Sequence, residues 1–491
     1  MAASFFIGAA CTVAFAPFHW FWVAPLAFGL ILALIEAAPS LGAAASRGFA
    51  FGLGYFLGGV SWVYVALNVY GSMPMPLAAI ATFGFCAYLA IFPALAFWLL
   101  KRVPPGAPWL AAAPAFWVLT EWLRGWLFTG FAWQAIGYSQ TSESPLVGWG
   151  AIVGVYGVSL AVVMTSASVG LLVRDARTHF TRVGTAFAVF ALLALWIGGA
   201  LLSRVEWTMA QGAPFAVSLL QGNIPQELKW RDDWMQKTLQ TYSDLIDASD
   251  GARLIVLPEA ALPLLSDSVP VDYLERIVAR ARAGRADVLI GLIERSRDGE
   301  IFNSVFSVGT SPVQVYRKHH LVPFGEFVPP MFGWALQWLN IPVQGIGRGQ
   351  TEPRPMSLAD QKVAINICYE DTFGGEIVLQ LPEATILVNV SNTAWFGRSW
   401  AQPQHLQIAR MRAIETGRPV LRATNTGMTA AIDPHGRVIA VAEPFTKAAL
   451  RVTVQGYSGV TPFVRYGNAL VIGLAALLAI AGTAAGLWLK Q

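Results

Sequence analysis

Charged side chains are scarce in this sequence of 491 residues. Only 13% of the residues are Asp, Glu, Lys or Arg, whereas 55% are hydrophobic and the mean hydropathy is +0.53. Soluble domains usually carry about 25% charged residues. The shortage excludes an ordinary soluble protein for the chain as a whole and indicates a membrane protein. The net charge of +4 is small, and we expect no nucleic-acid partner.

The amino-terminal apolar segment lacks two features of a secretory signal peptide. It has neither a positively charged start nor an obvious cleavage site. We therefore interpret it as a retained helix.

Apolar runs long enough to cross a bilayer are numerous, since about 18 or more residues suffice. They lie near 4–19, 21–38, 48–70, 76–100, 107–128, 147–173, 183–202 and 467–488. We expect about eight transmembrane helices, seven within 1–204 and the eighth within 461–491. Residues 205–460 carry most of the charge and predict a separate domain.

Lysine and arginine in the short loops predict the orientation. These residues follow the second, fourth, sixth and last helices: Arg47, Lys101, Arg102, Arg174, Arg177, Arg182 and Lys490. The third loop has no charge and the fifth has only Glu143. Both termini should therefore face the cytoplasm, which places 205–460 outside, on the periplasmic or extracytoplasmic side of the membrane.

Cysteine is also rare. Two of the three, Cys11 and Cys86, lie in apolar segments, where small packing residues are common. Cys368 is the only thiol of the outer domain and has no nearby partner for a disulfide. A lone thiol in an oxidising compartment is a liability unless it has a use.

The outer domain alternates between strand-like and helical patterns. We expect strands at 215–223, 253–261, 287–295, 302–309, 313–320, 362–370, 384–392, 419–426 and 429–440, and helices at 232–249, 271–283 and 402–417. Continuous apolar strands such as "LIVL" and "ILVNV" indicate sheets buried on both faces. The pattern predicts an α/β or α+β domain of its own.

Three stretches offer groups that can do chemistry. "INICYED" places Cys368 where a strand meets a turn, near backbone N–H groups that can hold an oxyanion. "LIVLPEAALP" ends an apolar strand with Glu259, whose pKa we expect to be raised, so that it can act as general base and acid. A buried strand cysteine and an exposed loop glutamate are the plainer alternatives.

The third stretch, "YRKHHLVPFGEFVP", supplies a cation. Lys318 can give fixed positive charge to a tetrahedral oxyanion. The adjacent His319 and His320 would point to opposite faces of a strand, which argues against a metal site with two histidines. A Cys–His pair stays possible. We expect no metal and no other cofactor.

The order of these residues resembles that of a known family. Glu259 after "LP", Lys318 before "HLVPFGE" and Cys368 in "CYE" resemble the Glu–Lys–Cys triad of the nitrilase superfamily. With membrane helices on both sides, the chain resembles the apolipoprotein N-acyltransferase family within it, as do "SNTAWFG" and "IDPHG". The resemblance implies an α-β-β-α sandwich for the outer domain.

The same resemblance implies an activity. The family moves a fatty acyl chain from a membrane phospholipid to the N-terminal amine of a diacylglyceryl-cysteine apolipoprotein. Glu259 would be the base, Cys368 the nucleophile that forms a thioester, and Lys318 with a backbone N–H near Tyr369 the oxyanion holder. Two half-reactions through a covalent intermediate predict ping-pong kinetics.

Further residues are candidates for supporting parts. Glu326 could orient Lys318, and Glu370 should share a strand face with Cys368 if the strand continues; ordinary salt bridges are the alternative for both, and simple packing for Tyr369. Aromatic side chains could line the acyl site or belong to a core: Trp230, Trp234, Trp334, Trp338, Trp395 and Phe396. The Trp-rich stretch 329–347 suits a lid at the membrane interface. Glu121 and Arg124 are candidates for headgroup binding.

Two other functions fit less well. A membrane-anchored amidase of the nitrilase type would use the same triad with water, but one helix would suffice as its anchor. A transporter or receptor would usually show polar or broken segments within the membrane, whereas the ionisable residues here gather in the outer domain.

Overall fold

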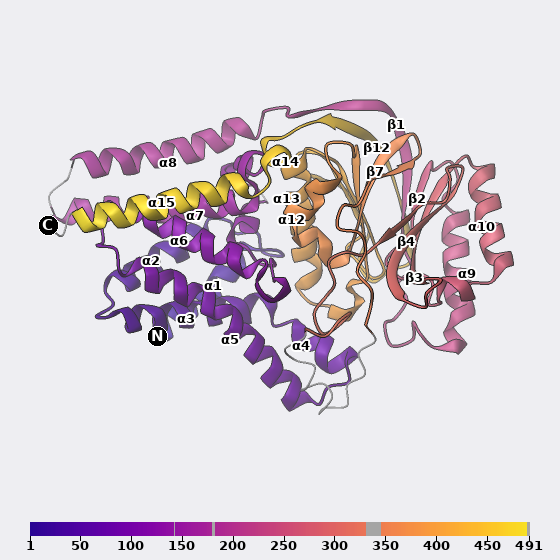
Figure 1. Cartoon of the computed structure of the whole chain (residues 1–491), viewed down its shortest axis with the longest axis horizontal. Coiled ribbons are helices and arrows are strands. Elements are labelled where there is room, and N and C mark those ends of the chain that lie inside the picture. The colour runs from indigo at the N-terminus through magenta and orange to yellow at the C-terminus, as the bar shows by residue number, and fades with distance from the viewer. Residues whose placement is uncertain (142, 179–181, 330–344, 489–491) are drawn as a thin grey trace. The chain divides into compact units, whose positions relative to one another are not determined.

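The chain divides into two compact units (Figure 1). The computed structural model describes all residues except 142, 179–181, 330–344 and 489–491. One unit, here the helical unit, combines residues 1–207, 398–415 and 461–491; the other, here the α/β unit, combines 208–397 and 416–460. Residues 398–415 are thus counted with the apolar helices, although they lie between two segments of the α/β unit in the sequence.

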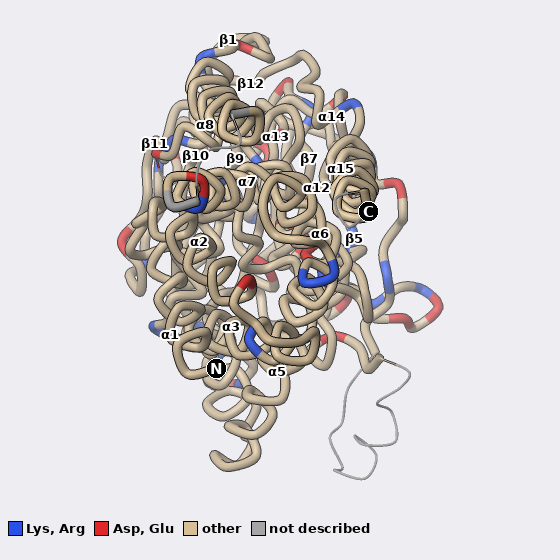
Figure 2. Tube along the Cα trace, turned by 90° about the vertical axis from the view of Figure 1, so that its left-hand side faces the viewer, with Lys and Arg blue, Asp and Glu red and all other residues tan. Residues whose placement is uncertain are grey.

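The helical unit is built from mostly apolar helices. These are α1 (Ala2–Cys11), α2 (Val23–Glu36), α3 (Leu41–Val60), α4 (Val63–Val65), α5 (Met75–Leu100), α6 (Trp109–Arg124), α7 (Gly150–Thr178), α8 (Arg182–Leu202), α13 (Ala401–Thr416), α14 (Pro462–Tyr466) and α15 (Ala469–Trp488). Figure 2 shows only isolated charged positions along them. The chain therefore has the apolar helices that its composition predicts.

The expected number of about eight spans is not confirmed. By length and composition, four helical segments in the described part of the chain can cross a bilayer: Met75–Leu100, Pro145–Ala176, Val183–Leu202 and Ala469–Trp488. Leu41–Val60 and Val63–Tyr70 would form a fifth if the pair, bent by 58°, is one span. The other apolar runs form shorter helices, because turns interrupt them; α1, for instance, has only 10 residues.

Buried polar groups stabilise the irregular segments of the helical unit. Glu121 accepts a hydrogen bond from the N–H of Ile136 at 2.8 Å, and Arg124 donates to the carbonyl of Trp133 at 2.8 Å. Both side chains are buried. They satisfy the backbone of a non-helical segment, which favours a structural part over the suggested headgroup binding.

Helix α13 is unusual in the helical unit because it is polar and yet buried. Gln404 accepts hydrogen bonds from the indole N–H groups of Trp62 at 3.1 Å and Trp133 at 2.9 Å. Glu415 forms an ion pair with Arg412 at 2.9 Å and accepts the N–H of Val155 at 2.7 Å. That N–H follows Gly154, whose φ of 65° breaks the hydrogen-bond ladder of α7.

Two six-stranded sheets form the α/β unit. The strands are β1 (Thr208–Gln221), β2 (Leu254–Val256), β3 (Asp287–Arg295), β4 (Ile301–Gly309), β5 (Val315–Arg317), β6 (Met356–Leu358), β7 (Gln361–Ile367), β8 (Ile386–Ser391), β9 (Val420–Thr424), β10 (Ala430–Ile432), β11 (Val438–Val441) and β12 (Ala448–Gly459). The sheet orders are β12-β1-β2-β3-β4-β5 and β11-β10-β9-β8-β7-β6. In each sheet three central strands run parallel: β1, β2 and β3 in the first, and β7, β8 and β9 in the second.

The main core of this unit lies between the two sheets. It joins Val217 and Val256 of the first sheet with Ile365 and Val388 of the second. Helices α9 (Asp232–Asp247) and α10 (Val271–Ala283) pack on the first sheet (Figure 1), and residues of both helices share a second apolar cluster with that sheet. The α/β prediction is confirmed; by itself the unit shows three of the four expected layers, since α13 is counted with the helical unit.

Arg418 ties three segments of the α/β unit together. Its guanidinium is fully buried and donates hydrogen bonds to the carbonyls of Ala384 at 2.6 Å, Gly459 at 2.9 Å and Pro382 at 3.3 Å. Burial lowers the pKa of Arg418 to about 10. The side chain therefore holds the segments before β8 and β9 against the end of β12.

We expect Arg418→Met to lower the free energy of unfolding by about 3 kcal/mol, because several buried carbonyls lose their donors. Thermal unfolding in detergent, followed by tryptophan fluorescence, measures the loss. The control is Arg253→Met, whose half-exposed guanidinium pairs with Asp360 at 2.9 Å and should matter by less than about 0.5 kcal/mol. Equal losses in the two variants would contradict the assignment.

Candidate active site

Cys368 stands at the point where β7 ends. It is the first residue of a 3₁₀ turn, Cys368–Thr372, and its φ of 54° lies in the left-handed region. Such a conformation is uncommon for a residue with a side chain, and strained residues of this kind cluster at functional sites. The strand expected over 362–370 therefore ends at Ile367, because the backbone turns at the cysteine. The thiol is half-buried.

Glu259 follows β2 and is held at both oxygens. Its Oε1 accepts a hydrogen bond from Asn303 Nδ2 at 2.8 Å, and its Oε2 accepts the backbone N–H of Asn392 at 2.8 Å. Gly291 leaves room for this turn, since a Cβ there would lie 2.3 Å from the carbonyl oxygen of Pro258. The carboxylate is thus fixed by donors from two other segments, Asn303 on β4 and Asn392 directly after β8.

The expected rise in the pKa of Glu259 is wrong. Burial alone would raise this pKa, but the charge of Lys318, the hydrogen bond from Asn303, the charge of Lys229 and the N–H of Asn392 together lower it below its ordinary value. The expectation rested on the apolar residues around Glu259 and did not include the hydrogen-bond donors and cations that lower its pKa. Glu259 is therefore ionised at neutral pH.

Lys318 follows β5 and lies between two carboxylates. Its ammonium contacts Glu326 Oε1 at 2.9 Å and Glu259 Oε1 at 3.5 Å, and its side chain is 1% exposed. Burial would lower the pKa of Lys318, but the two carboxylates raise it above its ordinary value. The lysine is therefore a permanent cation. Its contact with Glu326 is the contact that Glu326 would need in order to orient Lys318, as the sequence predicts.

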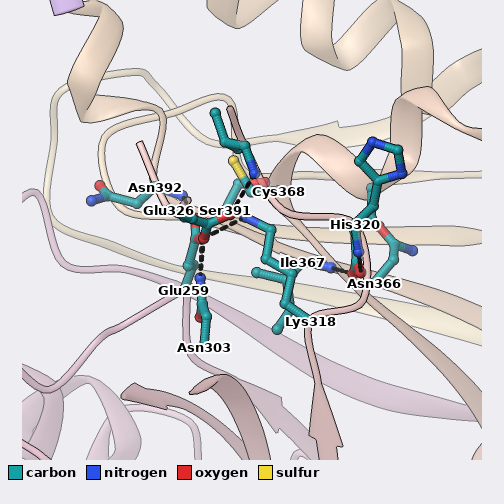
Figure 3. A network of polar contacts seen from close by, with 12 residues as sticks. Glu259, Asn303, Lys318, His320, Glu326, Asn366, Ile367, Cys368, Ser391 and Asn392 are labelled. Atoms are coloured by element: carbon teal, nitrogen blue, oxygen red, sulfur yellow. Dashed lines mark hydrogen bonds and ion pairs between the residues drawn. The ribbon is translucent and has the colours of Figure 1, made fainter. Parts of the chain in front are cut away.

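The thiol of Cys368 faces this charged group (Figure 3). Burial raises the pKa of Cys368, and the negative charge of Glu259 raises it further, while Lys318 opposes both. At rest the site therefore holds a neutral thiol beside an ionised carboxylate and an ammonium. This arrangement suits transfer of the thiol proton to Glu259 as the nucleophile attacks.

Glu370 does not share a strand face with Cys368, because the strand has already ended. Instead its carboxylate accepts hydrogen bonds from the N–H groups of Ile367 at 2.6 Å, His319 at 2.7 Å and His320 at 3.0 Å, and from Tyr316 Oη at 2.8 Å. These contacts join the turn at Cys368 to the residues that follow Lys318. Glu370 thus fixes the backbone before Cys368 relative to the backbone after Lys318.

The aromatic candidates have different surroundings. Trp230 and Trp395 are exposed, and Trp234 and Phe396 are half-buried. Trp234 lies on α9 beneath the ammonium of Lys237, 4.0 Å from the ring centre. Trp395 and Phe396 belong to the 3₁₀ turn Thr393–Phe396, directly after Asn392. A part in acyl binding stays a prediction for all four.

The remaining candidates are Tyr369 and the Trp-rich stretch. Tyr369 packs edge-on against Phe373 at 5.1 Å. Trp334, Trp338 and most of the suggested lid lie outside the described residues. Within the described residues, no three His, Cys, Asp or Glu side chains gather as a metal site would require.

Sequence reasoning missed Asn303, Asn392 and Lys229. Asn303 Nδ2 contacts both Glu259 and Glu326, the latter at 3.0 Å. Lys229 Nζ donates to the backbone carbonyl of Glu259 at 3.3 Å. A signal existed for the asparagines, since amides in strands that are otherwise apolar need buried partners. No local pattern pointed to Lys229.

Comparisons with known proteins identify the family of each part of the chain. One family model, described as the apolipoprotein N-acyltransferase N-terminal domain, matches residues 7–168, and another, carbon-nitrogen hydrolase, matches residues 216–462. Among solved structures, the C. elegans NitFhit protein is 16% identical, with a TM-score of 0.40; the match covers 55% of this chain and 63% of that one.

Relatives match over nearly the whole length. An apolipoprotein N-acyltransferase of Nitrosomonas europaea is 46% identical over 488 residues, which are 98% of this chain and 97% of that one. A protein of the same name from Chromobacterium violaceum is 43% identical over 96% of this chain and 92% of that one. The chain therefore belongs to the apolipoprotein N-acyltransferase family, and its α/β unit to the carbon-nitrogen hydrolases.

Proposed function

We propose that this protein is an acyltransferase that moves a fatty acyl chain from a membrane phospholipid to the N-terminal amine of a diacylglyceryl-cysteine apolipoprotein. The observation that carries the proposal is the grouping of Glu259, Lys318 and Cys368 within a chain of this family. The apolar helices supply the membrane setting that a lipid donor requires.

The first half-reaction acylates the enzyme. Glu259 takes the proton from the Cys368 thiol, and the sulfur attacks the ester carbonyl of the phospholipid. Lys318 and the backbone N–H of Tyr369 stabilise the oxyanion. Glu259 then returns the proton to the departing glycerol oxygen, which leaves a thioester on Cys368 and a lysophospholipid.

The second half-reaction transfers the chain. The amine of the apolipoprotein attacks the thioester carbonyl, and Glu259 accepts the proton that the nitrogen loses. Cys368 departs as the thiolate and regains its proton from Glu259. A thioester is reactive enough to acylate an amine, and the two steps give ping-pong kinetics.

The proposed setting is a bacterial inner membrane with the catalytic domain on the periplasmic side. The support is that Lys101, Arg102 and Arg174 lie at the ends of apolar runs. Short loops that carry Lys and Arg usually face the cytoplasm. In this proposal 1–204 and 461–491 are membrane segments and 205–460 is the catalytic domain.

Incubation with phospholipid alone should add the mass of one acyl chain to the intact protein. The adduct should be released by neutral hydroxylamine, because it is a thioester, and should be absent from Cys368→Ser. Cys86→Ala, which changes a buried cysteine of α5, is the matched control and should keep the adduct.

Addition of a diacylated lipopeptide should then transfer the chain to the peptide. Release of free fatty acid instead would favour the hydrolase alternative. A wild-type protein that forms no adduct while Cys368 is reduced would contradict an acyl-enzyme mechanism.

Glu259→Gln should slow adduct formation by about 10²–10⁴-fold, the usual contribution of a general base. The substitution preserves size and much of the hydrogen bonding. Stopped incubations read by intact mass measure the rate. Glu294→Gln is the control, since this buried carboxylate bonds Arg317 at 2.6 Å instead; a similar loss in both variants would argue against a specific role for Glu259.

A further inference from the structure

Lys229 is a second buried ammonium beside Glu259. It belongs to the segment between β1 and α9, and only 1% of it is exposed. Its Nζ donates to the backbone carbonyl of Glu259 at 3.3 Å. The mechanism above assigns this lysine no part, although burying a charged amine is costly unless the charge is balanced.

The charges around Glu259 show what balances it. The carboxylates of Glu259 and Glu326 share the single ammonium of Lys318, which lies closer to Glu326 at 2.9 Å than to Glu259 at 3.5 Å. Cys368 is a neutral thiol at rest. One cation cannot compensate two buried anions, and Lys229 supplies the second positive charge on the side of Glu259.

The position of Lys229 is fixed by hydrogen bonds of its own segment. Gln226 Oε1 accepts from Asn392 Nδ2 at 2.8 Å, and Ile224 exchanges two hydrogen bonds with Asn425, at 2.8 Å and 2.9 Å. The backbone N–H of the same Asn392 holds Glu259. Asn392 therefore anchors both the carboxylate of Glu259 and the segment that carries Lys229.

We propose that Lys229 is a positioning residue whose charge keeps Glu259 ionised and so able to accept the proton of Cys368. The inference rests on the proposed function for its meaning, since it assumes that Glu259 is the base. The direction of the effect follows from the charge of Lys229, which is one of the causes that lower the pKa of Glu259.

The lysine itself stays mostly protonated at neutral pH. Burial lowers the pKa of Lys229 to about 8, and the charge of Glu259 opposes that fall. The other titratable groups around Glu259 are Lys318, which also lowers its pKa, Glu326, which contacts the same Lys318 ammonium and the same Asn303 amide, and Cys368 (Figure 3).

The test measures how the reactivity of Cys368 depends on pH, without any lipid. The protein in detergent is treated with iodoacetamide from about pH 3.5 to about pH 8, a range that covers ordinary carboxyl groups. Mass spectrometry of the peptide that contains Cys368 gives the rate. Below the pKa of Glu259 the base is protonated, so the rate should fall on the acid side of the profile.

Lys229→Gln removes the charge but keeps a donor for the carbonyl of Glu259. We expect it to raise the pKa of Glu259 and move the acid limb to higher pH by about one unit, which is about a tenfold lower rate below the limb. Lys229→Arg keeps the charge and should keep the wild-type limb. Lys447→Gln, which removes a half-exposed partner of Asp244 at 3.1 Å, is the control and should leave the profile unchanged.

A uniform loss of rate in both Lys229→Gln and Lys229→Arg, with the limb in its wild-type place, would overturn the proposal and leave a structural role. An unaltered profile in Lys229→Gln would overturn it as well. If thermal unfolding shows that Lys229→Gln does not fold, Lys229→Met, which fills a similar volume without charge, decides by the same criterion. Failure of the acyl-transfer proposal would be seen separately, as a wild-type protein that forms no thioester.

Discussion

One buried ammonium shared by two carboxylates is the interaction on which this site depends. Lys318 contacts both Glu326 and Glu259, and burying two carboxylates without a cation between them would be costly. The pair of sheets excludes water from these charges, which strengthens their interaction. The donors Asn303 and Asn392 then fix the carboxylate of Glu259 so that its negative charge remains directed at the thiol.

The two sheets bring together residues that are far apart in the sequence. Glu259 and Cys368 follow β2 and β7, which are parallel-paired central strands of the first and second sheet. Because side chains at strand ends escape the packed core between the sheets, they can carry polar chemistry while the strands themselves stay apolar. Glu370 adds the remaining constraint, since its carboxylate binds the backbone on both sides of the site.

Much of the candidate site could be predicted from the sequence. Glu259 and Lys318 each stand next to a strand in a distinctive local pattern, and Cys368 is the only cysteine outside the apolar helices. The pKa of Glu259 could not be predicted in the same way, because it depends on residues from other segments. Asn392 lies 133 residues later in the sequence, and Lys229 belongs to the segment before α9. The left-handed backbone of Cys368 was not predicted either. For that reason Glu370 was wrongly expected on the same strand face as Cys368.

The sequence alone determined that the chain combines apolar helices with a more polar α/β part. Long apolar runs and buried strands are local patterns of consecutive residues, so they can be recognised without the tertiary structure. Which apolar runs form helices of spanning length was decided by turns and bends, such as the 58° bend after Val60. Tertiary structure likewise decided that α13 is buried with the apolar helices and that Lys229 meets Glu259. Contacts of this kind join distant segments, and a buried charge acquires its partners only when those segments fold against one another.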